Sequence, residues 1–298
     1  MRRQVNLVRR SPFDAGFQTE VTVAPRQYWN LRIVNAIASV TNLLSALLLL
    51  SQKEEMTNTT FQDLADTPNL AASSTFAGYP VWKHTLALPP QVLMGSTGTF
   101  ELLYFLLVGH SWALMVSHFL KADSRVLDIG CGCGKTARFL INDRGVAHYA
   151  GFDVLKLSID WSREHLTPGS NGRFEFHHAD LSNDMYNPHG NLQACDYRFP
   201  SVDSTVDLAF AASLFTHLLE MDCRHYLRET ARVLKCGGLA IISVHIAPAP
   251  GTRYSGTEAR IDVDVDYFIE LASAAGLTLK ERPGDLCGQE ILVFERAA

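Results

Sequence analysis

Three glycines at alternate positions follow a short apolar run near the middle of this chain. Residues 126, 127 and 129 are apolar, and the run stops at Gly130, which is followed by Gly132 and Gly134. The run predicts a buried strand that ends in a turn. Residues 135–141 carry apolar side chains at helical spacing, so we expect a helix to begin near Gly134. In this order of strand, turn and helix, backbone N–H groups and a helix N-terminus can face a ligand.

An aspartate completes this motif. Asp128 lies two residues before Gly130, which gives the pattern D-x-G-x-G-x-G. This pattern differs from the dinucleotide fingerprint G-x-G-x-x-G. It resembles motif I of the class I S-adenosylmethionine (SAM)-dependent methyltransferases, in which the turn passes under the methionine part of SAM. The resemblance implies that Asp128, Gly130, Cys131, Gly132 and Gly134 contact the cofactor. When this motif is considered alone, an ordinary tight turn that binds no ligand is the alternative interpretation.

From residue 125 onward the pattern alternates between strands and helices. We expect strands over 125–129, 146–152, 173–178, 205–211, 239–246, 277–280 and 291–295, and helices over 155–165, 221–234 and 266–275. Repeated β-α units predict an α/β fold with a doubly wound, mostly parallel sheet that binds ligands at the carboxyl ends of its strands. The resemblance implies a Rossmann-like sheet of seven strands in the order 3-2-1-4-5-7-6, with the last strand antiparallel.

Four further stretches match the same family in order and spacing, and two of them carry an aspartate. Asp153, with Val154, follows the second strand, where the resemblance implies that an acid binds the ribose hydroxyls; a helix N-cap is the alternative. Asp180, with Leu181, follows the third strand, where the family's acid takes the adenine amino group; a turn aspartate is the alternative.

The fourth strand and the turn before the fifth strand extend the match. Ala211 and Ala212 end the fourth strand, and the resemblance implies that their backbone groups meet the methionine moiety. Residues 232–239 read R-V-L-K-C-G-G-L, and Cys236 replaces the family's usual proline in this glycine turn. The combined signals over 125–296 are far more specific than any single motif.

The segment before the first strand divides into two expected parts. Residues 1–85 form an N-terminal extension that we expect to be partly α-helical. Its uncharged stretch 33–50 has polar residues on one helical face, which favours an amphipathic helix over a membrane span. This helix could mediate a homodimer. Residues 86–121 predict a helical cap, with helices at about 99–108 and 111–121 broken at Gly109, unless they simply pack on the sheet. The cofactor-binding domain is expected over 122–298.

Methyl transfer from SAM requires alignment of the acceptor with the methyl–sulfur bond and exclusion of water. The sulfonium is already activated, so no metal is expected. A general base helps when the acceptor is a hydroxyl. His217, after the fourth strand, and His245, at the end of the fifth, are the candidate catalytic bases, although each could be purely structural. Tyr254 and Arg253 could touch the substrate.

Composition limits the class of partner. The 298 residues carry a net charge of −5, with no basic excess that would indicate binding to nucleic acid or an anionic membrane. Six cysteines without a C-x-x-C pair favour neither a zinc site nor a disulfide framework, and a cytoplasmic setting is the simplest.

The preferred function is methylation of a small molecule, with oxygen or nitrogen as acceptor and S-adenosylhomocysteine as product, and secondary metabolism is the suggested setting. Two alternatives stay open. One is a SAM-binding fold without methyl transfer, such as a cyclase or a regulator. The other is a peptide or protein methyltransferase.

Overall fold

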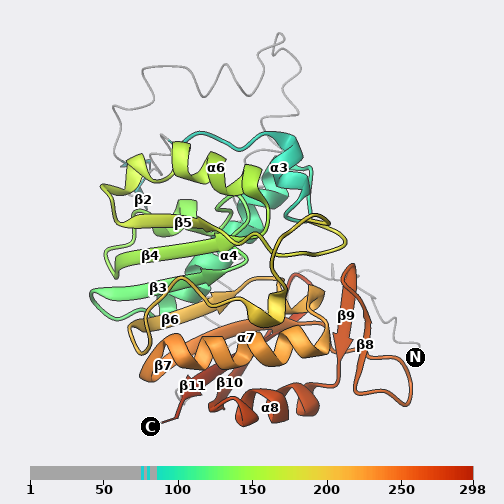
Figure 1. Cartoon of the computed structure of the whole chain (residues 1–298). Helices are drawn as coiled ribbons and strands as arrows, with labels where there is room; N and C mark the ends of the chain where they lie inside the picture. Colours follow the sequence, from blue (N-terminus) through green and yellow to red (C-terminus); the bar gives the residue numbers. More distant parts are fainter. Residues whose placement is uncertain (1–74, 77–78, 81–85, 298) are drawn as a thin grey trace, which may run out of the picture. The chain divides into compact units, whose positions relative to one another are not determined.

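The computed structural model in Figure 1 describes residues 75–76, 79–80 and 86–297. These residues belong to one compact unit, Ser74–Ala298. The helix expected over 33–50, and with it the expected dimer contact, lies outside the described residues. The short strands β1 (Thr75–Phe76) and β2 (Tyr79–Pro80) pair in antiparallel fashion.

A seven-stranded sheet forms the centre of the described unit (Figure 1). Its strands, from one edge to the other, are β5 (Phe174–His178), β4 (Val146–Asp153), β3 (Ser124–Ile129), β6 (Val206–Ala211), β7 (Leu234–Val244), β11 (Gln289–Arg296) and β10 (Leu277–Leu286). In chain order this is 3-2-1-4-5-7-6, and β11 runs antiparallel to both of its neighbours. The expected fold class and strand order are therefore confirmed.

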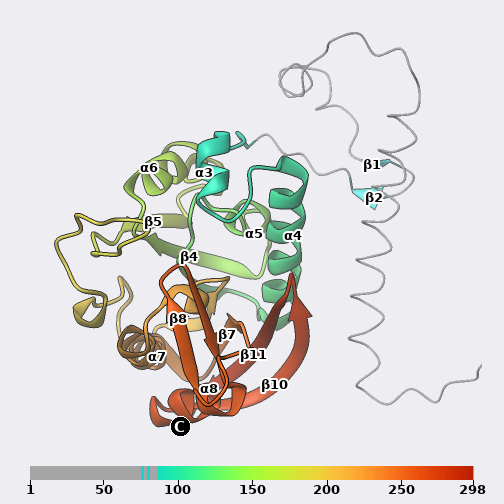
Figure 2. The ribbon, with the colours of Figure 1, turned by 90° about the vertical axis from the view of Figure 1, so that its right-hand side faces the viewer.

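Helices cover both faces of the sheet, as Figure 2 shows for α4 on one side and α7 on the other. The helices are α3 (Gln91–Gly95), α4 (Leu102–Phe119), α5 (Ala137–Leu140), α6 (Lys156–His165), α7 (Glu220–Val233) and α8 (Val265–Ala274). Alternate residues of β3 point to opposite faces because strand side chains alternate. Val126 joins the core cluster with α4, α5 and α6, and Leu127 joins the cluster with α7 and α8.

The expectation of two helices around Gly109 is wrong, because α4 runs unbroken through this residue. A glycine inside a helix usually weakens it by about 1 kcal/mol. Here the missing side chain allows close packing, since a Cβ at Gly109 would lie 2.1 Å from the carbonyl oxygen of Lys135. Helix α4 is also long and apolar enough to cross a bilayer, which is weak evidence because the buried helix of a sheet protein passes the same test.

Two elements differ from the sequence prediction around β7. The segment Cys236–Gly238 was expected to be a turn before the strand, but β7 already begins at Leu234 and continues through it. The register against β6 shifts there, which is an irregularity that a Gly237 φ of +70° accommodates. After β7 the chain forms an unpredicted hairpin of β8 (Tyr254–Thr257) and β9 (Arg260–Val263).

Candidate cofactor and substrate site

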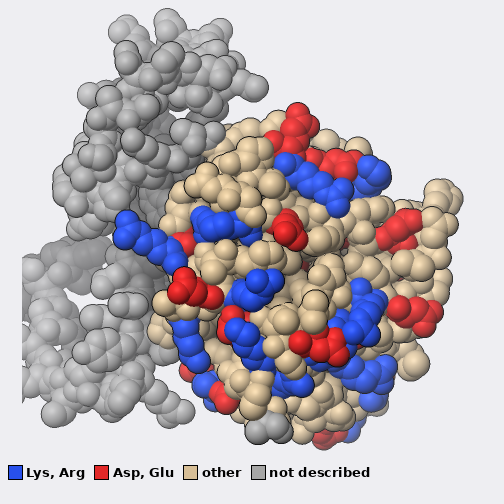
Figure 3. All heavy atoms as spheres, turned by 60° about the vertical axis from the view of Figure 1, so that its left-hand side comes forward, with Lys and Arg blue, Asp and Glu red and all other residues tan. Residues whose placement is uncertain are grey.

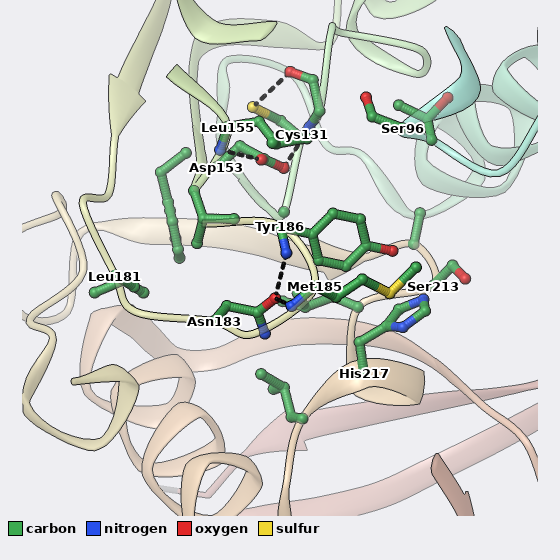
Figure 4. Close-up of a pocket in the computed structure, with 18 of the residues that line it drawn as sticks. Ser96, Cys131, Asp153, Leu155, Leu181, Asn183, Met185, Tyr186, Ser213 and His217 are labelled. Atoms are coloured by element: carbon green, nitrogen blue, oxygen red, sulfur yellow. Dashed lines mark hydrogen bonds between the residues drawn. The ribbon is translucent and has the colours of Figure 1, made fainter. Parts of the chain in front are cut away.

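A cavity of about 560 Å³ opens at the carboxyl ends of β3, β4 and β6 (Figure 4). Nine of the residues predicted from the sequence line it: Asp128, Gly130, Cys131, Gly132, Asp153, Val154, Leu181, Ala212 and His217. Four do not, namely Gly134, Asp180, Ala211 and His245. The structure therefore brings most of the predicted positions together at the sheet edge where ligands of doubly wound folds bind.

The glycine turn forms one wall of this cavity. Gly130, Gly132 and Gly134 all have positive φ, at +78°, +53° and +71°, a region that residues with a Cβ seldom occupy. A Cβ on Gly132 would also lie 2.7 Å from Cγ2 of Thr97. The N–H groups of Gly130 and Cys131 donate to the carbonyl of Phe152 at 2.9 and 3.0 Å, which joins the turn to the end of β4. The turn thus presents bare backbone toward a ligand.

Asp153 stands opposite the glycine turn at the end of β4. Its Oδ2 accepts a hydrogen bond of 2.8 Å from the N–H of Gly132, and its Oδ1 accepts one of 2.9 Å from the N–H of Leu155. Helix α6 has Leu155 as its N-cap residue and no side-chain cap, so Asp153 is not the N-cap residue of this helix. Burial raises the pKa of Asp153, and the backbone N–H groups around it oppose this rise. A carboxylate in this position can accept hydrogen bonds from vicinal hydroxyls.

Asp180 lies outside the cavity lining. Its carboxylate accepts hydrogen bonds from the side-chain amides of Asn187 at 3.1 Å and Asn191 at 2.5 Å. These two hydrogen bonds lower its pKa. The neighbouring residues Leu181 and Ser182 line the cavity instead. Asp180 therefore organises the 182–191 loop here, and its contact with adenine stays a prediction.

His217 faces the cavity from the short 3₁₀ helix Phe215–His217 (Figure 4). Its Nδ1 lies 2.8 Å from the carbonyl oxygen of Glu258 at the tip of the β8–β9 hairpin. A carbonyl only accepts, so Nδ1 carries the proton, and Nε2 of the neutral ring keeps a free lone pair. The pKa of His217 is lowered, mainly by burial. The ring of Tyr186 packs edge-on against it at 5.6 Å between centroids.

The structure does not bring the other candidate base, His245, into the cavity lining. Its backbone pairs with Asp262 of β9, which positions the hairpin. Tyr254 donates a 2.6 Å hydrogen bond to the carbonyl of Leu218, and Arg253 forms an ion pair with Glu270. Neither of these residues lines the cavity, so the structure assigns them packing contacts rather than substrate contacts.

One wall of the cavity is formed by Gly95–Gly98 at the end of α3, within the cap expected over 86–121. Lys135 Nζ donates a 2.8 Å hydrogen bond to the carbonyl of Thr97, and the Cys133 thiol lies 3.5 Å from the carbonyl of Leu93. Burial raises the pKa of Cys133 to about 12, so this thiol stays protonated and acts as a packing group. These contacts hold the start of the expected cap against the glycine turn.

Several other lining residues were not singled out individually in the sequence. They are Asn183, Met185 and Tyr186 of the loop after β5, Ser213 and Leu214 after β6, Asp222 and Tyr226 of α7, and Glu258 of the hairpin. Spacing of four residues along α7 could have paired Asp222 with Tyr226, but nothing in the sequence indicates that this face meets the cavity. In the part of the chain that the structure describes, no cluster of three or more His, Cys, Asp or Glu side chains could hold a metal ion.

A seven-stranded sheet of this order, with a glycine turn on its first strand and an acid at the end of the second, is the fold of class I SAM-dependent methyltransferases. Residues 126–238 match the methyltransferase domain family. Methyltransferase GfsG of Streptomyces halstedii is 31% identical over 173 residues, which cover 54% of this chain and 55% of that protein. The chain thus spans about half the length of this curated relative.

Two solved structures share the fold. One is the 1,6-didemethyltoxoflavin-N1-methyltransferase of Burkholderia thailandensis with bound 1,6-didemethyltoxoflavin and S-adenosylhomocysteine, at a TM-score of 0.50 and 17% identity over 72% of this chain and 94% of that chain. The other belongs to the complex between the Haloferax volcanii Trm112 methyltransferase activator and the putative methyltransferase, at a TM-score of 0.50 and 16% identity over 70% of this chain and 97% of that chain. The cofactor of this class is SAM, and the bare turn at Gly132 and the carboxylate of Asp153 fit it.

Proposed function

We propose that this chain is a SAM-dependent methyltransferase that methylates a hydroxyl group of a small molecule. The observation that carries the proposal is the 2.8 Å contact between Nδ1 of His217 and the Glu258 carbonyl, in the same cavity as the glycine turn and Asp153. Because the Glu258 carbonyl holds the proton on Nδ1, Nε2 is available to accept a proton. Nitrogen acceptors often need no such base, so the arrangement favours oxygen.

The residues that line the cavity have separate roles in the proposed reaction. Bound SAM supplies an activated methyl group on its sulfonium. The glycine turn and Asp153 would hold the cofactor. Nε2 of His217 would take the proton of the acceptor hydroxyl as the methyl group passes from sulfur to oxygen, the methyl–sulfur bond breaks and S-adenosylhomocysteine is left. Met185 and Tyr186 line the cavity beside His217 and exclude water from the reacting atoms. Burial keeps the ring of His217 neutral at a lower pH than usual, which suits a base.

A small molecule fits the cavity and the surface better than a nucleic acid. On the face seen in Figure 3, basic and acidic side chains are intermixed, without a continuous basic area. Such a surface lacks the electrostatic footprint of nucleic-acid binding. The named relative GfsG and the fold-sharing Burkholderia enzyme are both methyltransferases, which supports the reaction class. A role in secondary metabolism and a cytoplasmic location belong to the same proposal.

The test is turnover by the purified full chain. SAM is incubated with a panel of phenols and alcohols, and S-adenosylhomocysteine and methyl ethers are measured by mass spectrometry. We expect equal amounts of both products with at least one acceptor, and a loss of turnover in His217→Gln. His225→Gln is the control, because the Nε2 of His225 contacts the carbonyl of Tyr197 and the ring does not line the cavity. Tight SAM binding without product from any acceptor would favour the alternative of a non-methylating SAM-binding protein.

A further inference from the structure

Helix α7 turns two polar side chains without hydrogen-bond partners toward the cavity. Asp222 and Tyr226 are four residues apart and so lie on one face of this helix, and both line the cavity. The side chain of Tyr226 is only 3% exposed, and its ring packs against Phe152 and Phe199. No described residue donates to, or accepts from, the Tyr226 hydroxyl or the Asp222 carboxylate. Tyr226 is buried and Asp222 is half-buried, and the cavity that both residues line gives a ligand access to their polar atoms.

The charges around the cavity specify the sign of that partner. Lys135 is the only lysine or arginine among its described lining residues, and its Nζ is bound to the Thr97 carbonyl beside the glycine turn. At the other end, Glu258 adds a second carboxylate near the hairpin tip, where it accepts a hydrogen bond from the N–H of Asp184. The end of the cavity lined by α7 therefore attracts a cation and repels an anion.

Apolar side chains also line the cavity. Leu214, Leu218, Ala194 and Met185 line the same cavity as Asp222. Apolar walls with one carboxylate and one phenol suit a ligand with a hydrocarbon or aromatic body and a single charged group.

Resting on the proposed function, we propose that Asp222 and Tyr226 form a subsite for a protonated amine of the substrate, which makes the substrate class an apolar amino alcohol or aminophenol. The carboxylate of Asp222 accepts hydrogen bonds from the ammonium group, and the hydroxyl of Tyr226 offers its oxygen as a second acceptor. The amine anchors one end of the molecule while the acceptor hydroxyl lies at His217.

The electrostatics of Asp222 agree with this assignment. Burial raises the pKa of Asp222, and among the described residues only His225 acts against the rise. A half-buried carboxylate without a nearby cation has a raised pKa, and a bound ammonium group would lower that pKa. Amine binding should therefore strengthen as the pH rises and Asp222 ionises.

The experiment uses three probes of similar shape that differ in charge. Tyramine carries an ammonium group, 4-ethylphenol is neutral, and 3-(4-hydroxyphenyl)propanoate carries a carboxylate. Each is titrated by calorimetry into the full chain saturated with S-adenosylhomocysteine. A charge-assisted hydrogen bond contributes enough to make tyramine bind about tenfold or more tightly than 4-ethylphenol, and the propanoate should bind most weakly.

Variants assign the preference to the two residues. Asp222→Asn should bring the affinity for tyramine down to that for 4-ethylphenol, and Tyr226→Phe should weaken tyramine binding several-fold. Asp266→Asn is the matched control, because Asp266 is an exposed acid in the first turn of α8, outside the cavity; it should leave the ratio unchanged.

Equal binding of the three probes would overturn the amine subsite. So would a tyramine preference that survives Asp222→Asn, or the absence of binding by all three probes to the saturated protein. Failure of the proposed function appears separately, as a lack of S-adenosylhomocysteine binding or of methyl transfer. A protein that binds S-adenosylhomocysteine but treats the probes alike would lose only the subsite.

Discussion

The hydroxyl of Tyr149 donates a 2.6 Å hydrogen bond to Oδ2 of Asp128, and both side chains are buried. The two residues lie on the adjacent strands β4 and β3, beneath the glycine turn. The ring of Tyr149 stacks on Phe174 at 4.5 Å, which holds the hydroxyl in place. Burial raises the pKa of Asp128 to about 7, although the hydrogen bond from Tyr149 and the charge of Lys135 oppose this rise. The first acid of the motif is therefore a buried, titratable group close to neutral pH.

This relationship predicts how stability depends on pH. The folded protein holds a proton on Asp128 up to pH of about 7, whereas the unfolded chain releases it near the ordinary value of 3.8. Between these two values the folded state binds more protons, so the contribution of Asp128 to the free energy of unfolding falls as the pH rises and then levels off. Urea denaturation at a series of pH values should show this fall in the wild type and lose it in Asp128→Asn.

The control for this prediction is Tyr149→Phe. This variant lacks the hydroxyl that donates to Asp128, and that hydrogen bond lowers the pKa of Asp128. The free energy of unfolding should therefore keep falling up to a higher pH than in the wild type. A wild-type and an Asp128→Asn protein with parallel pH profiles would contradict the assignment.

Asp153→Asn should weaken binding of S-adenosylhomocysteine by ~1–3 kcal/mol, the usual range for hydrogen bonds with a charged partner. Asp153→Ala would leave the N–H groups of Gly132 and Leu155 without any acceptor, whereas the amide of Asn keeps one acceptor oxygen for them and is therefore the milder change. Isothermal calorimetry measures the effect. The control is Asp266→Asn, at an exposed acid of α8 outside the cavity lining, which should bind with wild-type affinity. Unchanged affinity in Asp153→Asn would remove the ribose assignment.

Gly132→Val should abolish cofactor binding, because a side chain there meets Thr97 at 2.7 Å and fills the bare wall of the cavity. Positive φ alone costs about 1–2 kcal/mol of stability for a residue with a Cβ. Gly172→Val has the same kind of strain at φ +76°, with no atom within 4 Å of its Cβ position, and does not line the cavity. It should therefore lose stability but keep binding. Full calorimetric binding by Gly132→Val would contradict the role of the turn.

Gly109→Ala separates local propensity from packing. Propensity predicts a gain of about 1 kcal/mol for alanine inside a helix. The structure predicts a loss, because the new Cβ would lie 2.1 Å from the backbone oxygen of Lys135. Ser111→Ala, at a half-buried position of the same helix, should show the propensity effect without the clash. Denaturant melts measure both, and a stabilised Gly109→Ala protein would contradict the close contact.

The rate of methyl transfer should rise with pH as His217 loses its proton. Because burial lowers the pKa of His217, the neutral base predominates from a pH below the usual 6.5, and kcat/KM should level off there. His217→Gln should lose both the rate and this rise, whereas the profile of His225→Gln should match the wild type. A His217→Gln enzyme with the wild-type profile would exclude the ring as the base.

Much of the cofactor end could be predicted from the sequence. The alternation of strands and helices after residue 125 was sufficient for the sheet, and the confirmed strand order followed from the family resemblance. Gly132 and Asp153 could be recognised because a close backbone approach and an acid at a strand end are local requirements. The position of a residue in a family motif did not predict where its side chain points. The carboxylate of Asp180 binds Asn187 and Asn191 and does not line the cavity.

The sequence by itself determined the glycine turn, the alternation of strands and helices, and the acid after β4, because each of these depends on residues close together in the chain. Only the tertiary structure decided the substrate end. Glu258 contacts His217 although 41 positions separate them, and Gly109 is explained by the carbonyl of Lys135 in the turn between β3 and α5. Such contacts arise from how the helices and the hairpin pack on the sheet, and no local pattern of residues encodes them.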